Sequence, residues 1–157
     1  GSVTAVYTIL VDGEDMDDPI ADISRATLDG HIVLRRTLAS AGHYPPIDVL
    51  GSVSRLMERV ASATHRAAAR QLRGLMAAHA DARDLISIGA YVAGTDPLVD
   101  AAVGLQPEIN AFLRQAPHDV TGFDTALARL VEMGGEHVTE DVDDAFPATT
   151  EPVGEAA

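Results

Sequence analysis

The sequence contains no lysine and no cysteine, and each absence excludes a class of site. All eleven basic residues in the 157-residue chain are arginine. This chain therefore cannot build a G-x-x-x-x-G-K-[ST] phosphate-binding loop or a Schiff-base lysine, so the phosphates of any nucleotide must be held mainly by something else. Disulfides, thiolate zinc sites and cysteine nucleophiles are excluded as well.

Positive charge is scarce relative to negative charge, and long apolar runs are missing. The net charge of −13 argues against free nucleic acid or anionic lipid as a general partner and favours basic partners. No apolar run approaches the length of a membrane span, and no charged-then-apolar leader is seen, so a cytosolic protein is the default expectation. The six histidines are scattered without an H-E-x-x-H pattern, and no metal site is expected.

The first stretch, Val3–Val11 (VTAVYTILV), is apolar at nearly every position and rich in β-branched residues. This pattern is typical of a strand buried on both faces of a parallel sheet. Asp12–Asp22 follows with six acids and no base, and it predicts a solvated loop. Calcium binding there is not favoured, because Met16 interrupts the D-x-D-x-D-G alternation that starts at Asp12.

The next segment alternates strand and helix signals. We expect a short buried strand within Leu28–Leu34, a two-turn helix at Arg35–Ala41 ended by Gly42, and a short strand at Ile47–Leu50 behind Pro45 and Pro46. Strand, helix and strand in this order form an α/β pattern. Because so few strands cannot close a sheet, the pattern predicts the end of an α/β domain.

From Met57 onward the sequence is rich in alanine and helical in its spacing. A long helix capped by Ser62 or Thr64 is expected to run to about Ile88. Its inner positions are predicted to be Ala68, Leu72, Leu75, Met76 and His79. Four arginines lie along one side of this region, namely Arg59, Arg66, Arg70 and Arg73. They are interpreted as a solvated helix face or, alternatively, as a docking surface for an acidic partner.

A break at Gly89–Pro97 is expected to separate this helix from three shorter ones. Thr95 is predicted to cap a helix through Val103, Pro107 to begin another with Ile109, Phe112 and Leu113 on one face, and Gly122–Gly134 to form the last, with Phe123, Leu127, Leu130 and Val131 inward. Together these helices predict a small bundle. The segment after Gly135 carries seven acids and no arginine, which predicts a disordered acidic tail.

The stretch His43–Met57 (HYPPIDVLGSVSRLM) carries the candidate functional residues. Tyr44 offers a flat apolar surface to a base, and Arg55 offers a planar fork of donors to phosphate oxygens. The alternatives are core packing for Tyr44 and a structural salt bridge for Arg55. The run Gly51–Arg55 is not a nucleophile elbow, because neither serine has the two flanking glycines of G-x-S-x-G.

Four runs in order carry a family resemblance: GSVTAVYTILVDGEDMDDPIAD, LDGHIVL, AGHYPPIDVLGSVSR and RDLISIGAY. Over residues 1–115 they resemble the C-terminal part of the flagellar and type III secretion export ATPases, relatives of the rotary ATP synthase α and β subunits. VDGEDMDDPIAD and LDGHIVL favour the export branch over a synthase β subunit. Arg35-Arg36 departs from the family's serine-arginine, and no second adenine-facing aromatic has a counterpart.

The resemblance implies a fold of α/β followed by all-α class. Residues 1–58 would be the arginine-finger part of a RecA-like P-loop NTPase domain, residues 59–134 a helical C-terminal domain, and residues 135–157 the acidic tail. It also implies a homohexameric ring with ATP sites between subunits. In such a ring Arg55 of the S-x-S-R run reaches the neighbour's γ-phosphate as a catalytic residue. Tyr44 of the Y-P-x-x-D run lies against adenine in its own subunit's site.

The function that the resemblance implies is ATP hydrolysis that energises flagellar or type III protein export at the cytoplasmic face of a membrane. ATP and Mg²⁺ would be bound mainly by parts that precede Gly1, so the chain alone is expected to be inactive. The expected partners are further copies of itself and export-gate, stalk and chaperone proteins. The alternative is a non-catalytic docking module that uses the helical domain, with Gly94–Val103 as the candidate contact. Cut from its sheet, Val3–Val11 would leave apolar edges exposed and promote oligomerisation.

Overall fold

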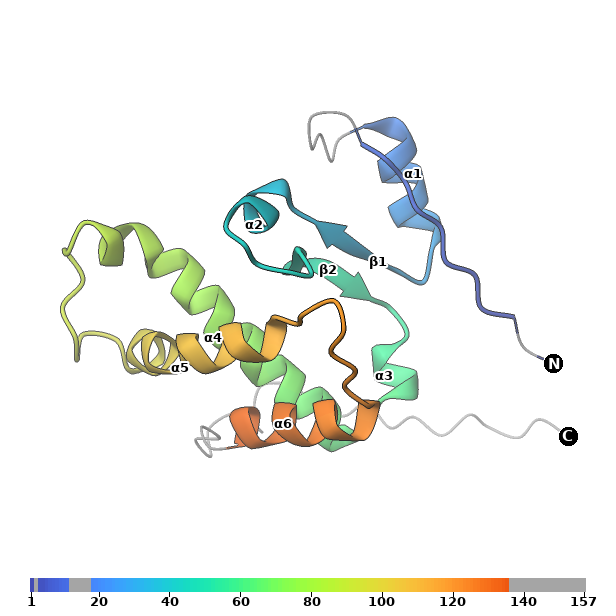
Figure 1. Cartoon of the computed structure of the whole chain (residues 1–157). Helices are drawn as coiled ribbons and strands as arrows, with labels where there is room; N and C mark the ends of the chain where they lie inside the picture. The colour runs from blue at the N-terminus through green and yellow to red at the C-terminus, as the bar shows by residue number, and fades with distance from the viewer. Residues whose placement is uncertain (2, 12–17, 136–157) are drawn as a thin grey trace, which may run out of the picture.

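The chain folds into a small α/β half followed by a helical half, in a computed structural model that describes residues 1, 3–11 and 18–135 (Figure 1). This order of classes agrees with the sequence prediction. The elements are α1 (Pro19–Thr27), β1 (Gly30–Leu34), α2 (Arg36–Ser40), β2 (Ile47–Ser54), α3 (Met57–Val60), α4 (Ala63–Ser87), α5 (Pro97–Leu113) and α6 (Phe123–Gly135). The predicted acidic tail lies outside the described residues. No helix among those described is long and apolar enough to cross a membrane.

The prediction of a buried strand at Val3–Val11 is wrong for this chain. The segment runs as an unpaired trace past α1 (Figure 1), and its apolar side chains are exposed, with Val6 91% and Leu10 94% accessible. A strand exists only when its N–H and C=O groups pair with a neighbour. The sheet of the described residues has two strands, β1 and β2, and residues 3–11 pair with neither of them.

Helix α1 replaces the end of the predicted acidic loop. The Asp18 carboxylate accepts hydrogen bonds from the main-chain N–H groups of Ile20 at 2.9 Å and Ala21 at 3.2 Å. Pro19 occupies the first turn, where its missing N–H costs nothing. An aspartate followed by proline is thus a helix start here, and the loop prediction is wrong from Pro19 onward.

Strands β1 and β2 pair antiparallel, with α2 in the connection between them. Helix α2 ends as predicted, because Gly42 follows its C-cap with a φ of 68° that few other residues adopt. Strand β2 is longer than predicted and continues through Ser54. Its second half pairs with the start of β1, where Gly30 lies opposite Ser54.

Helix α4 is the centre of the helical half and packs against both α5 and α6. Its start is predicted correctly, since the Ser62 hydroxyl caps it by accepting from the N–H of His65 at 3.2 Å. The buried core of this half comprises Leu72, Leu75, Ala102, Ile109 and Met133. Met76 and His79 are only partly buried.

One helix, α5, stands where two were predicted. Asp96 caps it in place of Thr95, since its carboxylate accepts from the N–H groups of Leu98 at 2.9 Å and Val99 at 3.3 Å. Pro107 lies inside the helix and removes one main-chain donor, a break that usually ends a helix. Here Ala102 and Ile109 on either side of Pro107 are fully buried, and this burial keeps the helix continuous across it.

Helix α6 has the predicted position, and Leu130 packs against the core as predicted, but Phe123 does not. Phe123 is 68% exposed and meets only the edge of the His65 ring, 6.0 Å away between centroids, so its predicted inward placement is wrong. Met133 is buried instead. Gly134 lies so close to α4 that a Cβ on it would come within 2.8 Å of the Ala68 Cα.

Candidate functional site

The two predicted site residues lie at opposite ends of strand β2. Tyr44 precedes the strand, and Arg55 follows its last residue, Ser54. The first and last residues of β2 pair with Leu34 and Gly30, the two ends of the five-residue strand β1, so they lie about 13 Å apart at about 3.3 Å per residue. The fold therefore holds Tyr44 and Arg55 apart, and it does not form one compact site from them.

Tyr44 is half exposed, with 54% of its surface accessible, so the predicted alternative of core packing does not describe it. Its peptide bond to Pro45 is cis, and its carbonyl accepts from the N–H of Gln115 at 2.8 Å. The side chain borders an open depression on the surface. That depression is lined by Tyr44, Pro45, Pro46, Gln115, Ala116, Pro117 and Asp119.

His43, the neighbour of Tyr44, is buried, with only 7% of its surface accessible. The Nε of Arg114 donates a long hydrogen bond of 3.4 Å to its Nδ1, which must be unprotonated to accept it. Burial, and to a smaller extent the Arg114 charge, lower the pKa of His43. Together with the Gln115–Tyr44 bond, this contact ties the segment before β2 to the end of α5.

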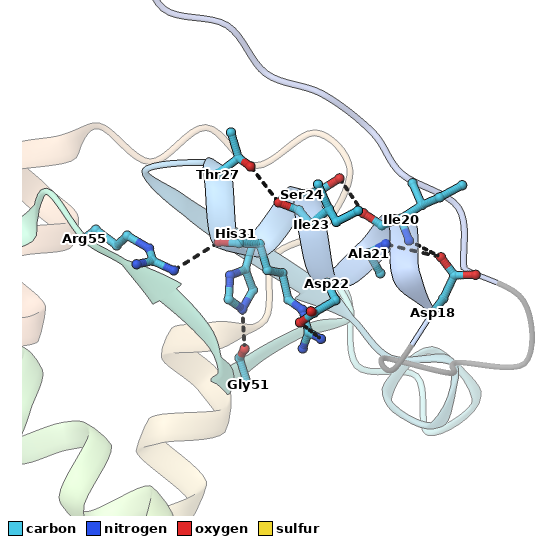
Figure 2. Close-up of polar contacts among 11 residues, drawn as sticks. Asp18, Ile20, Ala21, Asp22, Ile23, Ser24, Thr27, His31, Gly51 and Arg55 are labelled. Carbon is cyan, nitrogen blue, oxygen red and sulfur yellow. Dashed lines mark hydrogen bonds and ion pairs between the residues drawn. The ribbon is translucent and has the colours of Figure 1, made fainter.

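Arg55 is exposed at the far end of β2 and points toward α1 (Figure 2). Its main-chain N–H donates to the Asp29 carbonyl at 2.8 Å, and its Nη2 donates to the Arg25 carbonyl at 3.0 Å. Among the described residues it forms no ion pair, so the alternative of a structural salt bridge has no partner there. A guanidinium has five N–H donors, and most of those on Arg55 remain available.

Between its ends, β2 carries a bulge held by side chains. Val33 pairs with Asp48 and His31 with Val53, so residues 49–52 of β2 oppose only Ile32 of β1. The Asp48 carboxylate accepts from the Gly51 N–H at 2.9 Å. The same carboxylate forms an ion pair with Arg35 at 3.0 Å.

Burial alone would raise the pKa of Asp48, but these hydrogen bonds and the Arg35 charge outweigh it and lower the pKa. The carboxylate is therefore ionised in the folded chain at neutral pH. Arg35, whose role the sequence leaves open, stabilises this bulge through its ion pair with Asp48.

The four arginines predicted to form one face do not act alike. Arg66 pairs with Glu58 at 3.2 Å. Arg73 donates to three main-chain carbonyls of β2 and is thus structural, neither solvated nor waiting for a partner. Arg59 and Arg70 are exposed. Arg73 and His43 carried no sequence signal, because their partners are main-chain groups or residues far away along the chain.

A different exposed surface lies at the α4–α5 end of the helical half. Four large apolar side chains are accessible there. They are Leu85 (50%), Ile88 (75%), Val92 (68%) and Leu98 (51%). The loop is ordered by Asp100, whose carboxylate accepts from the Gly94 N–H at 2.7 Å and from the Tyr91 hydroxyl at 2.9 Å. Within the described part of the chain, no group of three or more histidine or acidic side chains is placed to hold a metal ion.

Two family models match the chain in succession. Residues 1–54 match the nucleotide-binding domain of the ATP synthase alpha/beta family. Residues 61–132 match the T3SS EscN ATPase C-terminal domain. The junction falls between β2 and α4, where the α/β half gives way to the helical half.

Several curated relatives are nearly half identical or more. A flagellum-specific ATP synthase of Salmonella typhimurium is 47% identical over 130 residues, which cover 83% of this chain and 28% of the relative. A type 3 secretion system ATPase of Sinorhizobium fredii is 52% identical over 127 residues, covering 81% of this chain and 28% of the relative. The chain thus spans less than a third of the length of these relatives.

Solved structures agree in fold. The assembled ATPase EscN of the enteropathogenic E. coli type III secretion system is 38% identical, with a TM-score of 0.82 over 85% of this chain and 32% of that one. EscN in complex with its central stalk EscO is 37% identical, with a TM-score of 0.77 over 85% of this chain and 31% of that one.

Proposed function

The chain belongs to the flagellar and type III secretion ATPase family and corresponds to its C-terminal part, and from that premise we propose that it supplies two nucleotide contacts to an ATPase that energises protein export. Arg55 acts as the arginine finger, and Tyr44 lies against the adenine. The substrate is ATP with Mg²⁺, and the assembly is a homohexameric ring at the cytoplasmic face of a membrane.

The accessible guanidinium of Arg55 supports its proposed role. The residue is exposed at the end of a strand, and its side chain makes one hydrogen bond, to a carbonyl oxygen. A phosphoryl group in transfer spreads charge over its oxygens, and a fixed planar cation stabilises that charge. Fingers of this kind raise turnover by about a thousandfold or more.

The separation along β2 is the observation that carries the ring proposal. The strand places Tyr44 and Arg55 at its two ends, where Arg55 bonds to α1 and Tyr44 borders the depression beside Gln115. Because the two side chains face different parts of the subunit, we assign them to different ATP sites. Tyr44 serves the subunit's own ATP and Arg55 that of the neighbour, so each ATP site contains residues from two copies.

The phosphate cradle must come from elsewhere, because the chain contains no lysine for it. Within the full-length enzyme, residues 1–58 complete a RecA-like domain and residues 59–134 form the helical C-terminal domain. The exposed apolar segment Val3–Val11 supports this, since it becomes a buried strand once neighbouring strands pair with it. Alone, the chain neither holds Mg²⁺-ATP firmly nor hydrolyses it.

The test is Arg55→Ala in the full-length enzyme, with Arg59→Ala as the matched control. Arg59 is an exposed arginine four residues further along the chain. We expect Arg55→Ala to lower kcat about a thousandfold while nucleotide affinity stays nearly unchanged. Arg59→Ala should keep normal turnover. Near-normal turnover of Arg55→Ala would refute the finger.

A second function, docking of a partner protein, is favoured by the exposed α4–α5 end. Four large apolar side chains there are half or more exposed, on the ends of α4 and α5 and the connecting loop that the Asp100 carboxylate holds in shape. Exposed apolar side chains on an ordered loop are typical of a protein contact. EscN has been solved in complex with its central stalk EscO. We propose that this α4–α5 end, which includes Val92 and Gly94–Val103, contacts a stalk, gate or chaperone protein of the export system.

Docking is tested by Val92→Asp, with Val120→Asp as a control, because Val120 is 96% exposed outside this loop. We expect Val92→Asp to weaken binding of the system's stalk protein by calorimetry while basal turnover is kept. Equal stalk affinity in both variants would refute this contact.

A further inference from the structure

Arg73 of α4 is bonded to strand β2 in a way that neither proposed function uses. Its Nη1 donates to the carbonyls of Val49 at 2.5 Å and Ser52 at 3.3 Å, and its Nη2 to that of Leu50 at 3.2 Å. We propose that Arg73 is the positioning residue that sets the place of Arg55. This inference rests on the proposed role of Arg55 as the finger.

The bulge is the reason that β2 needs such a residue. Residues 49–52 lie opposite the single residue Ile32, so their four carbonyl groups cannot all pair with β1. The Arg73 guanidinium donates to three of these four carbonyls. The fourth carbonyl, of Gly51, lies 3.2 Å from the Nε2 of His31 (Figure 2). The bulge therefore owes its shape largely to one guanidinium from another element.

The inner side of the bulge is closed by Asp48 and Ser52. The Ser52 hydroxyl donates to the Asp48 carbonyl at 2.6 Å and accepts from the Val33 N–H at 3.0 Å. A Cβ on Gly51 would lie 2.7 Å from the Asp48 Oδ2, so this glycine admits no side chain without displacing the carboxylate. These bonds lie within the α/β half, whereas the three hydrogen bonds of Arg73 connect the bulge to the helical half.

The bulge fixes the register of the three residues that follow it. Val53 pairs with His31, Ser54 with Gly30, and Arg55 then bonds to Asp29 and Arg25. If the bulge gained or lost one residue, Arg55 would shift by about 3.3 Å and its side chain would turn to the other face. A misplacement of about 1 Å is enough to cost about a hundredfold in rate when a group must meet a transition state.

Arg73 is itself held in place by its helix. Leu72 and Leu75 on either side of it are 4% and 1% exposed in the core of the helical half. The base of the side chain therefore cannot drift, and a guanidinium can span several carbonyls where an ammonium is a single point charge. Through these hydrogen bonds, Arg73 fixes the strand that precedes Arg55 relative to α4.

The experiment compares Arg73→Met with Arg70→Met in the full-length ATPase. Methionine keeps an unbranched apolar stem and removes the guanidinium donors, and Arg70 is exposed one turn earlier on the same helix. We expect Arg73→Met to lower kcat by about a hundredfold with an unchanged KM for Mg²⁺-ATP and an intact ring. Arg70→Met should match the unmodified enzyme. An equal effect of both variants, or none, overturns the proposal.

The double variant Arg55→Ala with Arg73→Met separates positioning from a general structural role. If Arg73 acts through Arg55, the double variant turns over no more slowly than Arg55→Ala alone, whereas multiplied losses would contradict the proposal. Should Arg73→Met fail to fold, Arg73→Lys is used with the same criterion, and an intermediate kcat is expected. Normal turnover of Arg55→Ala would instead refute the finger itself, so the two failures are distinguishable.

Discussion

Gln115 donates its main-chain N–H to the carbonyl of Tyr44 at 2.8 Å, and this bond joins the segment after α5 to the segment before β2. The Tyr44 ring is left half exposed while its backbone is fixed. A ring held in this way offers a flat surface to a base without first having to be ordered.

We therefore expect the ring of Tyr44, and not its hydroxyl, to determine nucleotide affinity. In the full-length enzyme, Tyr44→Ala should weaken ATP binding by about tenfold, because stacking of an aromatic pair contributes about 0.5–1.5 kcal/mol. Tyr44→Phe should bind as the unmodified enzyme does. Binding of a fluorescent ATP analogue measures both, and equal losses in the two variants would contradict a stacking role.

His43 should make the stability of the chain depend on pH. Burial and Arg114 lower its pKa, so the unfolded chain binds more protons at this ring than the folded chain between the lowered value and the ordinary value near 6.5. Its contribution to stability is complete above that ordinary value and is lost as the pH falls toward the lowered one. Urea titrations from pH 7.5 to 5 should show a smaller loss of unfolding free energy for His43→Asn than for a variant of the exposed His118. If the unfolding free energy of both variants fell with pH at the same slope, this role of His43 would be contradicted.

Gly51 should not tolerate a side chain. Because a Cβ there would lie 2.7 Å from the Asp48 Oδ2, Gly51→Ala should destabilise the folded chain by about 1–3 kcal/mol. Gly74→Ala is the control, since its Cβ would meet nothing within 4 Å on the α4 surface. Gly74→Ala should instead stabilise the folded chain by about 0.5–1 kcal/mol, because alanine is favoured over glycine within helices. Denaturant unfolding of the two variants measures the sign of each change in unfolding free energy.

The 157-residue chain alone should self-associate through its first segment. Val6 and Leu10 are more than 90% exposed in a segment with strand composition and no strand partner. Light scattering should find oligomers, and Val6→Asp combined with Leu10→Asp should reduce them. A clean monomer of the unmodified chain at high concentration would be the contrary result.

Local signals in the sequence predicted several elements correctly. Ser62 and Gly42 mark the ends of helices by their own chemistry, a hydroxyl that caps and a backbone free to adopt positive φ, and both act as expected. Tyr44 and Arg55 were chosen for the chemistry of a ring and a guanidinium; their roles stay predictions, and the structure leaves both side chains accessible.

The wrong predictions share one cause, because each of these segments or residues depends on a partner far away in the sequence. Val3–Val11 has the composition of a strand but pairs with no strand among the residues that the structure describes. Pro107 has the local character of a helix start, yet core packing on both sides carries α5 through it. Arg73 looked like a surface arginine, because its partners are main-chain carbonyls more than twenty residues away.

Helix α5 connects the two regions for which functions are proposed. It begins at the loop held by Asp100, ends at the residues bonded to His43 and Tyr44, and its 17 residues span about 25 Å. Any coupling that this rod carries must be reciprocal, because linkage between two binding equilibria has no direction. A stalk protein that tightened nucleotide binding tenfold would itself be held tenfold more tightly by the nucleotide-loaded subunit. The nucleotide state of each subunit would then decide where on the ring an asymmetric partner rests.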